Sequence, residues 1–190
     1  MSVIATIKTS ILVPIHPAGY PFIAIFFALT VFFGVLLGIY FWFPGLIITT
    51  WCIYFFRNPL RHTPQRNSLV LSPADGTIIN VLTAEPPKEL HLKGKNWTKI
   101  SIFMSVFDVH VNRAPMTGKI IKKIYFPGEF FNASLDKASE KNERVLITML
   151  SEYGKKISFV QIAGLVARRI LCPVEENKKL MAGEQFGIIR

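Results

Sequence analysis

A histidine with polar neighbours directly follows an apolar run in the middle of this chain. Asp108, His110, Asn112 and Arg113 come just after Ile-Ser-Ile-Phe-Met at residues 100–104. We expect a buried strand to end here and to hold the imidazole in one geometry while leaving it reachable. Imidazole is the one side chain whose unperturbed pKa lies near neutrality, so His110 is a candidate general acid or base. The pattern equally fits a half-buried strand histidine whose ring nitrogens bond to backbone.

A carboxylate that could orient this imidazole lies earlier in the chain. Asp75 stands in Ser-Pro-Ala-Asp-Gly at residues 72–76, which by itself is ordinary turn chemistry. A carboxylate bonded to one ring nitrogen fixes the tautomer, so that the other nitrogen can take a proton from a hydroxyl. Asp108 competes for this role, because residues two apart lie on the same side of an extended strand. Such a pair needs a nucleophile, and none can be named before the last residue, Arg190.

The first part of the chain is strongly apolar. Residues 9–56 contain no Asp, Glu, Lys or Arg, and residues 21–42 can cross a hydrocarbon core of roughly 30 Å as a helix. Phe-Pro-Gly at residues 43–45 should end that helix, and residues 46–56 then reach only about 17 Å. We predict a membrane-anchoring segment over residues 1–56, formed by one long span and a short second arm that make a helical hairpin. A single span with an interfacial tail is the alternative.

The rest of the chain is basic. All 12 acidic residues and all but one of the 22 basic residues lie from Arg57 onward, which gives this part a net charge of +9. Basic residues that follow an apolar segment predict a cytoplasmic domain on the inner face of the cell membrane, attracted to anionic lipid by about 1 kcal/mol per cation. The basic residues are scattered and form no nucleic-acid motif, which argues against a nucleic-acid partner. Cys52 and Cys172 show no metal or redox spacing, so we expect neither a metal site nor a disulfide.

After a basic linker over residues 57–68, the sequence predicts a β-rich domain over residues 69–190. Short β-branched runs recur between turn residues, several of them alternating apolar and polar. Residues 132–144 are charged and aperiodic, and we expect a long loop there. The expected strands are residues 69–71, 77–81, 99–103, 119–125, 145–149, 157–162 and 169–172.

Two turns of this domain share the pattern Pro-x-x-Gly-x-Ile-Ile, at residues 73–79 and 115–121. Proline fixes φ on entry and glycine permits the positive φ of a tight turn, so both can form corners of a small barrel or sandwich. The tail at residues 174–189 repeats the theme and resembles the hairpin of biotinyl- and lipoyl-type domains. The predicted fold is therefore a mainly β domain, barrel- or sandwich-like, preceded by an α-helical membrane hairpin.

Several multi-residue motifs occur in order along nearly the whole chain. They are Tyr-Phe-Phe-Arg-Asn-Pro at residues 54–59, Ser-Pro-Ala-Asp-Gly at 72–76, Phe-Met-Ser at 103–105, Phe-Asp-Val-His-Val-Asn-Arg at 107–113, Asn-Ala-Ser-Leu-Asp-Lys-Ala-Ser at 132–139, Asn-Glu-Arg at 142–144 and Gly-Glu-Gln-Phe-Gly-Ile-Ile-Arg at 183–190. With them the chain resembles the phosphatidylserine decarboxylases, specifically the short membrane-tethered form. In that family a proenzyme cuts itself at a Gly-Ser bond shortly after the last of these motifs. The serine becomes a pyruvoyl group at the head of a small second subunit.

The resemblance implies roles for particular residues. This chain would be the larger subunit, or a truncated proenzyme that is inactive alone, because it lacks the Gly-Ser pair. Asp75 would orient His110, and His110 would activate the serine for self-cleavage and later return a proton to the substrate carbon. The pyruvoyl group would act as the electron sink for loss of CO2. Asn112, Arg113 and Lys137 are the candidates for binding the lipid substrate.

The resemblance also implies partners and a location. The chain would act with the small pyruvoyl-bearing subunit on phosphatidylserine at an anionic membrane, making phosphatidylethanolamine, and it leaves room for a homo-oligomer. Two readings without catalysis compete with this one. The first is a membrane-anchored, lipoyl-like adaptor, which would need a lysine at an exposed hairpin tip. The second is a module that only binds acidic lipids, and it leaves the Asp75 and His110 motifs unexplained.

Overall fold

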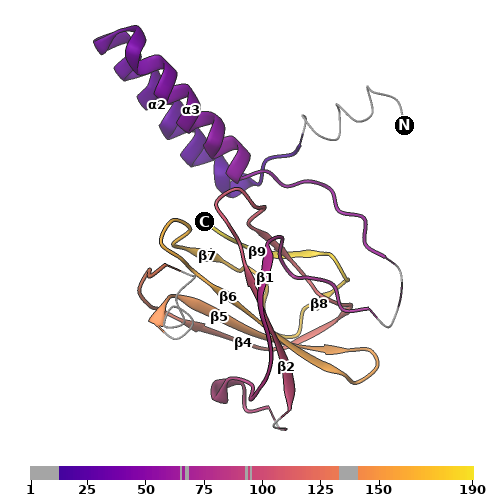
Figure 1. The fold of residues 1–190 in the computed structure, drawn as a ribbon. Coiled ribbons are helices and arrows are strands. Elements are labelled where there is room, and N and C mark those ends of the chain that lie inside the picture. Colours follow the sequence, from indigo (N-terminus) through magenta and orange to yellow (C-terminus); the bar gives the residue numbers. More distant parts are fainter. Residues whose placement is uncertain (1–12, 65, 67–68, 93, 95, 133–140) are drawn as a thin grey trace. The chain divides into compact units, whose positions relative to one another are not determined.

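The structure is a computed structural model that describes residues 13–64, 66, 69–92, 94, 96–132 and 141–190. The chain divides into two compact units, residues 1–61 and residues 62–190. The described part of the first unit is helical, and that of the second is built mainly of β-strands (Figure 1).

The first unit is a helical hairpin. A short 3-10 helix, η1 (Pro17–Gly19), leads into α2 (Tyr20–Leu37), and α3 (Ile39–Phe55) returns beside it (Figure 1). The two helices meet at Gly38, whose φ of +89° is a left-handed conformation that glycine adopts without steric cost.

The turn lies earlier than the sequence pattern predicted. The helix does not end at residues 43–45, because Pro44 lies within the second turn of α3, where it removes one hydrogen bond without ending the helix. The second arm is therefore 17 residues long, or about 25 Å of helix, rather than the eleven residues expected. Among the described residues, Pro17–Leu37 is the one helical stretch long and apolar enough to cross a membrane, and α3 is apolar but shorter.

Small residues allow the two helices to pack closely. Gly34 lies against the Trp42 indole, where an added Cβ would come within 2.5 Å of the ring. One turn away, the Thr30 and Thr49 hydroxyls lie 3.2 Å apart and are buried between the helices. Small side chains and inter-helical hydroxyl contacts are the features that hold apolar helices together in lipid or detergent. The hairpin is thus specified by packing rather than by charge.

The described residues of the second unit form three antiparallel sheets (Figure 1). The largest has the strand order β6-β5-β4-β8, a second has the order β3-β9-β7, and β1 and β2 form a hairpin. A 3-10 turn, η2 (Lys88–Leu90), lies between β1 and β2. The strands are β1 (Thr77–Ala84), β2 (Trp97–Phe103), β3 (Val111–Arg113), β4 (Gly118–Phe126), β5 (Arg144–Ser151), β6 (Lys156–Ile162), β7 (Ile170–Leu171), β8 (Lys179–Leu180) and β9 (Gln185–Ile189).

The core lies around β5 and between the two larger sheets. Residues 145–149 of β5 are buried on both faces of the strand, because β4 and β6 flank it and other elements cover both sides. Phe159 of β6 and Phe186 of β9 pack with ring centroids 4.9 Å apart and so join the two sheets. The prediction of a mainly β domain after an N-terminal apolar helix is confirmed.

Individual strands differ from the prediction in places. Residues 69–71 form no strand, and Leu71 donates one hydrogen bond to the Pro115 carbonyl. The short strands β3, β8 and β9 were not predicted as separate strands, because two to five residues carry too little periodicity to recognise. Residues 133–140 of the predicted loop lie outside the described residues.

The two repeated turns use glycine for different reasons. Gly76 precedes β1 with a φ of +147°, as the turn pattern predicted. Gly118 has no positive φ; it starts β4 where a Cβ would collide with the Leu150 carbonyl of β5. One glycine therefore serves backbone conformation, and the other allows close approach of a neighbouring strand.

The hairpin interface predicts the effect of a larger side chain at Gly34. Gly34→Leu should displace Trp42 from α2 and increase quenching of Trp42 fluorescence in brominated detergent micelles, with Trp51 and Trp97 replaced by Phe. Ala28→Leu is the matched control, because Ala28 is an exposed small residue of the same helix. Equal quenching in the two variants would contradict the packing of Trp42 on Gly34.

Candidate active site

His110 lies in the loop that leads into β3, rather than at the end of the preceding apolar strand as the sequence suggested. It is 4% exposed, and its Nδ1 lies 3.0 Å from the backbone carbonyl oxygen of Asp108. A carbonyl oxygen can only accept, so this contact requires the ring hydrogen on Nδ1. In the neutral imidazole Nε2 then carries the lone pair, which is the arrangement of a general base.

The Asp108 side chain is used within the same loop. Its Oδ2 accepts the Ser105 backbone N–H at 2.7 Å, and the Asp108 N–H donates to the Ser105 carbonyl at 2.9 Å. These two bonds close the turn just before His110. Asp108 thus holds the imidazole through its main chain, while its carboxylate shapes the turn.

The strand after His110 pairs with the last strand of the chain. Val111 and Asn112 of β3 lie opposite Ile188 and Gly187 of β9, in antiparallel register. The ladder extends to the histidine itself, because the Ile189 N–H donates to the His110 carbonyl at 3.2 Å. The end of β9 is therefore fixed directly beside His110.

Asn112, one of the substrate-binding candidates, lies inside the protein. Its Oδ1 accepts the Gln161 Nε2–H at 2.7 Å, and its Nδ2 donates to the Met104 sulfur at 3.7 Å. Gln161 belongs to β6, so this amide pair joins the two larger sheets. Gly187 passes beside it, and a Cβ there would come within 3.0 Å of the Gln161 Nε2.

Gln161 was missed by the sequence analysis. It is 4% exposed, and its Oε1 has no hydrogen-bond partner among the described residues. A buried acceptor without a donor is costly, so such an atom in a native protein calls for an explanation. The only signal in the sequence is one amide inside the apolar run Phe-Val-Gln-Ile at residues 159–162.

Arg113 joins β3 to the turn that carries Asp75. The Arg113 N–H donates to the Pro73 carbonyl at 2.9 Å, and its Nη1 donates to the Gly183 carbonyl at 3.1 Å. Arg113 and Asp75 are both half-buried. The structure thus brings the Ser-Pro-Ala-Asp-Gly turn and the His110 segment together by a backbone bond. Lys137, the remaining substrate-binding candidate, lies outside the described residues.

Cys172 follows β7 and lies close to Gly187, at 3.4 Å from a Cβ built on that glycine. Burial raises the pKa of the Cys172 thiol, while the nearby Lys123 ammonium acts in the opposite direction. Lys123 also donates to the Cys172 carbonyl at 2.7 Å. No group of three or more His, Cys, Asp or Glu side chains suited to a metal ion occurs within the described part of the chain.

The Asn112–Gln161 pair predicts a loss of stability when one partner is removed. Asn112→Ala leaves the Gln161 amide buried without its acceptor, which should lower the free energy of unfolding by about 1–3 kcal/mol. Urea unfolding of the detergent-solubilised chain, followed by circular dichroism, measures this. Asn80→Ala, at an exposed position of β1, is the control and should change the free energy of unfolding by less than about 0.5 kcal/mol. Equal midpoints for the two variants would contradict the structural role of the pair.

The raised pKa of Cys172 predicts slow alkylation. At pH 8 less thiolate is present than in an ordinary cysteine, so iodoacetamide should react more slowly with folded Cys52→Ser protein than with the same protein in urea. The rate should increase at a higher pH than for the unfolded chain. Lys123→Met removes the opposing cation and should slow the reaction further. Equal rates in the folded and unfolded protein would contradict the burial effect.

Comparison with known protein families agrees with this arrangement. The family model described as phosphatidylserine decarboxylase matches residues 48–190, which include α3 from Ile48 onward and every strand of the β unit. The match covers the Asp75 turn, the His110 segment and β9 in a single stretch. A match over most of the chain establishes the family, and this protein belongs to the phosphatidylserine decarboxylases.

Proposed function

We propose that this chain is the larger subunit of a pyruvoyl-dependent decarboxylase that converts phosphatidylserine to phosphatidylethanolamine. Its precursor would cut itself at a Gly-Ser bond a short way beyond Arg190. The family supports the decarboxylase activity. The observation that carries the self-cleavage proposal is the hydrogen bond between the Ile189 N–H and the His110 carbonyl, at 3.2 Å, because it fixes the end of β9 next to the proposed base.

His110 would act first as a general base. With its hydrogen on Nδ1, Nε2 can take the proton of the serine hydroxyl, whose oxygen then attacks the carbonyl carbon of the preceding glycine. The serine amine leaves that carbonyl, and the chain is joined through an ester. Loss of the serine α-proton and cleavage of the Cβ–O bond would then release the glycine carboxylate and cut the chain. Water would hydrolyse the enamine left at the head of the smaller fragment, through its imine form, to the pyruvoyl group and ammonia.

Asp75 would stabilise the positive charge that the His110 ring acquires when it takes a proton. The Pro73 carbonyl, two residues before Asp75, is bonded to Arg113 of β3, which keeps this turn beside the histidine segment. A carboxylate near an imidazolium stabilises the protonated form in the transition state. Since a backbone carbonyl already fixes the tautomer, we assign Asp75 an electrostatic role rather than the orienting role alone.

The Gln161 amide beside β9 is a proposed contact for the serine headgroup. A Cβ on Gly187 would lie 3.0 Å from the Gln161 Nε2, so β9 passes close to this amide, and the Gln161 Oε1 is a buried acceptor that a primary amine could satisfy. When bound, the pyruvoyl group would supply an electron sink for the carbanion left by CO2. His110 would return a proton to the substrate carbon. Arg113 and Lys137 remain proposed contacts for the lipid phosphate or carboxylate.

The lipid substrate fits a membrane location. The apolar hairpin includes a helix long enough to cross a bilayer, and the chain from Arg57 onward carries a net charge of +9. We place the β unit on the cytoplasmic side, because the basic residues follow the apolar segment. Anionic lipid would then be both the surface and the substrate source, and the small pyruvoyl-bearing subunit would be the partner chain.

The proposed function predicts the behaviour of His110 and Asp75 variants in the full precursor. His110→Ala should block self-cleavage, and Asp75→Ala should slow it to a similar or smaller degree, as followed on a denaturing gel. Asp108→Asn is the comparison, because it keeps the backbone carbonyl that contacts His110. The intact mass of the small co-purifying polypeptide should show the pyruvoyl group at its first position. Normal processing of both the Ala variants would remove these residues from the mechanism.

A further inference from the structure

The Asn-Glu-Arg motif at residues 142–144 carries part of the resemblance but has no assigned task. Its first residue, Asn142, is almost completely buried and uses its whole amide. Oδ1 accepts the Phe131 N–H, and Nδ2 donates to the Phe131 and Ala163 carbonyls, each at 2.8 Å. The Glu143 backbone is held on both sides, by its N–H to the Glu129 carbonyl and by its carbonyl to the Ala163 N–H. The Glu143 side chain therefore extends from a backbone that hydrogen bonds hold in place.

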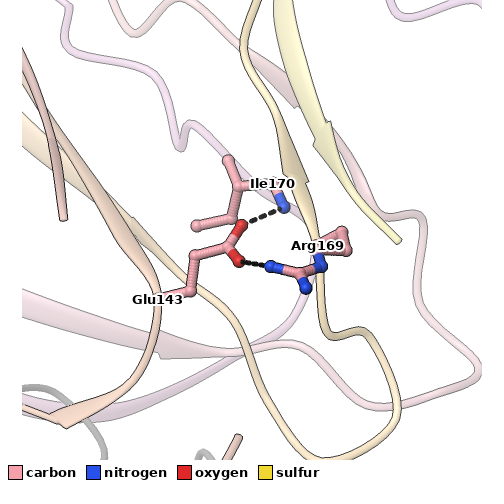
Figure 2. Close-up of polar contacts among 3 residues, drawn as sticks. All are labelled: Glu143, Arg169 and Ile170. Carbon is pink, nitrogen blue, oxygen red and sulfur yellow. Dashed lines mark hydrogen bonds and ion pairs between the residues drawn. The ribbon is translucent and has the colours of Figure 1, made fainter. Parts of the chain in front are cut away.

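The Glu143 carboxylate is buried at 2% exposure and holds the start of β7 (Figure 2). Its Oε1 accepts the Ile170 backbone N–H at 2.9 Å, and its Oε2 accepts the Arg169 Nη1–H at 2.6 Å. The Arg169 side chain is 63% exposed, so the buried carboxylate is paired with a cation at the protein surface. The two contacts fix both the main chain and the side chain of one short segment.

That segment is the support for the end of β9. Arg169 and Arg190 exchange two backbone hydrogen bonds, of 2.6 and 2.7 Å, and Ile170 lies opposite Ile189. On its other edge the same end of β9 bonds to the His110 carbonyl. The last residues are thus held between β7 and the His110 segment, and Glu143 fixes β7.

Stability alone is a weak explanation for this carboxylate. A buried ion pair contributes little more to folding than apolar side chains of the same size would, because desolvation of the charges offsets their attraction. A carboxylate with two directed contacts does fix geometry, as charge-assisted hydrogen bonds are short and angle-dependent. Self-cleavage needs that kind of control, because small displacements of the reacting atoms slow a reaction strongly.

We propose that Glu143 is a positioning residue for self-cleavage. Through Arg169 and Ile170 it sets the position of Arg190, and hence of the bond to be cut, relative to His110. This inference rests on the proposed self-cleaving precursor. It gives Glu143 no contact with the reacting atoms.

The test compares the self-cleavage rates of the full precursor and its variants at one temperature. Glu143→Gln and Arg169→Met should slow cleavage by tenfold or more. Arg169→Lys keeps a cation for Glu143 and should recover much of the rate. Glu152→Gln is the matched control, because it removes an ion pair of the same 2.6 Å length, between Glu152 and Lys179, and should stay within twofold of wild type.

A second measurement separates positioning from general instability. In uncut Arg169→Met precursor, hydrogen exchange should increase at the amides of Ile189 and Arg190 and stay at the control's level at the amides of β4 and β5, which separates a local change from a global loss of stability. The exposed Arg169 side chain makes this variant decisive even where Glu143→Gln does not fold. Cleavage of Arg169→Met at the wild-type rate would overturn the role of Glu143 and leave the proposed function standing. An uncut wild-type precursor would overturn both.

Discussion

The antiparallel pairing of β9 with β3 is the contact on which the rest of the site depends. It brings β9, a strand of five residues, beside a histidine that lies 79 residues before the end of that strand in the sequence. On its other edge β9 pairs with β7, so the strand is fixed from both sides. Loops alone would leave the end of the chain mobile, whereas a strand within a sheet has a defined register. Sheet pairing thus fixes the end of β9 beside His110.

Several buried polar side chains link the strands and loops around this pairing. Asn112, Asn142 and Glu143 are all buried, and each makes directed contacts that join different strands or loops. Buried polar groups cost free energy unless they are bonded, so they specify one arrangement more sharply than apolar packing does. Gln161 departs from this pattern with one unsatisfied oxygen, and it lies beside β9. In otherwise well-satisfied interiors, such exceptions tend to mark functional sites.

The sequence predicted the fold class and most long strands, because runs such as residues 145–149 and 157–162 are apolar enough to recognise alone. It placed the hairpin turn at residues 43–45 rather than at Gly38, since proline is a stronger sequence signal than a glycine in an apolar run. His110 and Asp75 were chosen by residue type and family motif. The part played by Glu143 could not be predicted, because it depends on contacts with Arg169 and Ile170, which are distant in sequence. Contacts of this range are set by sheet topology, which local patterns do not encode.

The acceptor for the His110 ring is a main-chain carbonyl, and this limits what side-chain mutagenesis can show. Any residue that keeps the turn at position 108 supplies the same oxygen, whereas Asp108→Ala also removes the carboxylate bond that closes this turn, so its effect does not report on the carbonyl alone. Substitutions at position 108 that preserve the turn would leave the proton on Nδ1 of His110. Replacing the amide that follows Asp108 by an ester, through chemical ligation, would weaken that oxygen as an acceptor without altering a side chain. The orientation of the His110 ring is therefore set by the path of the backbone.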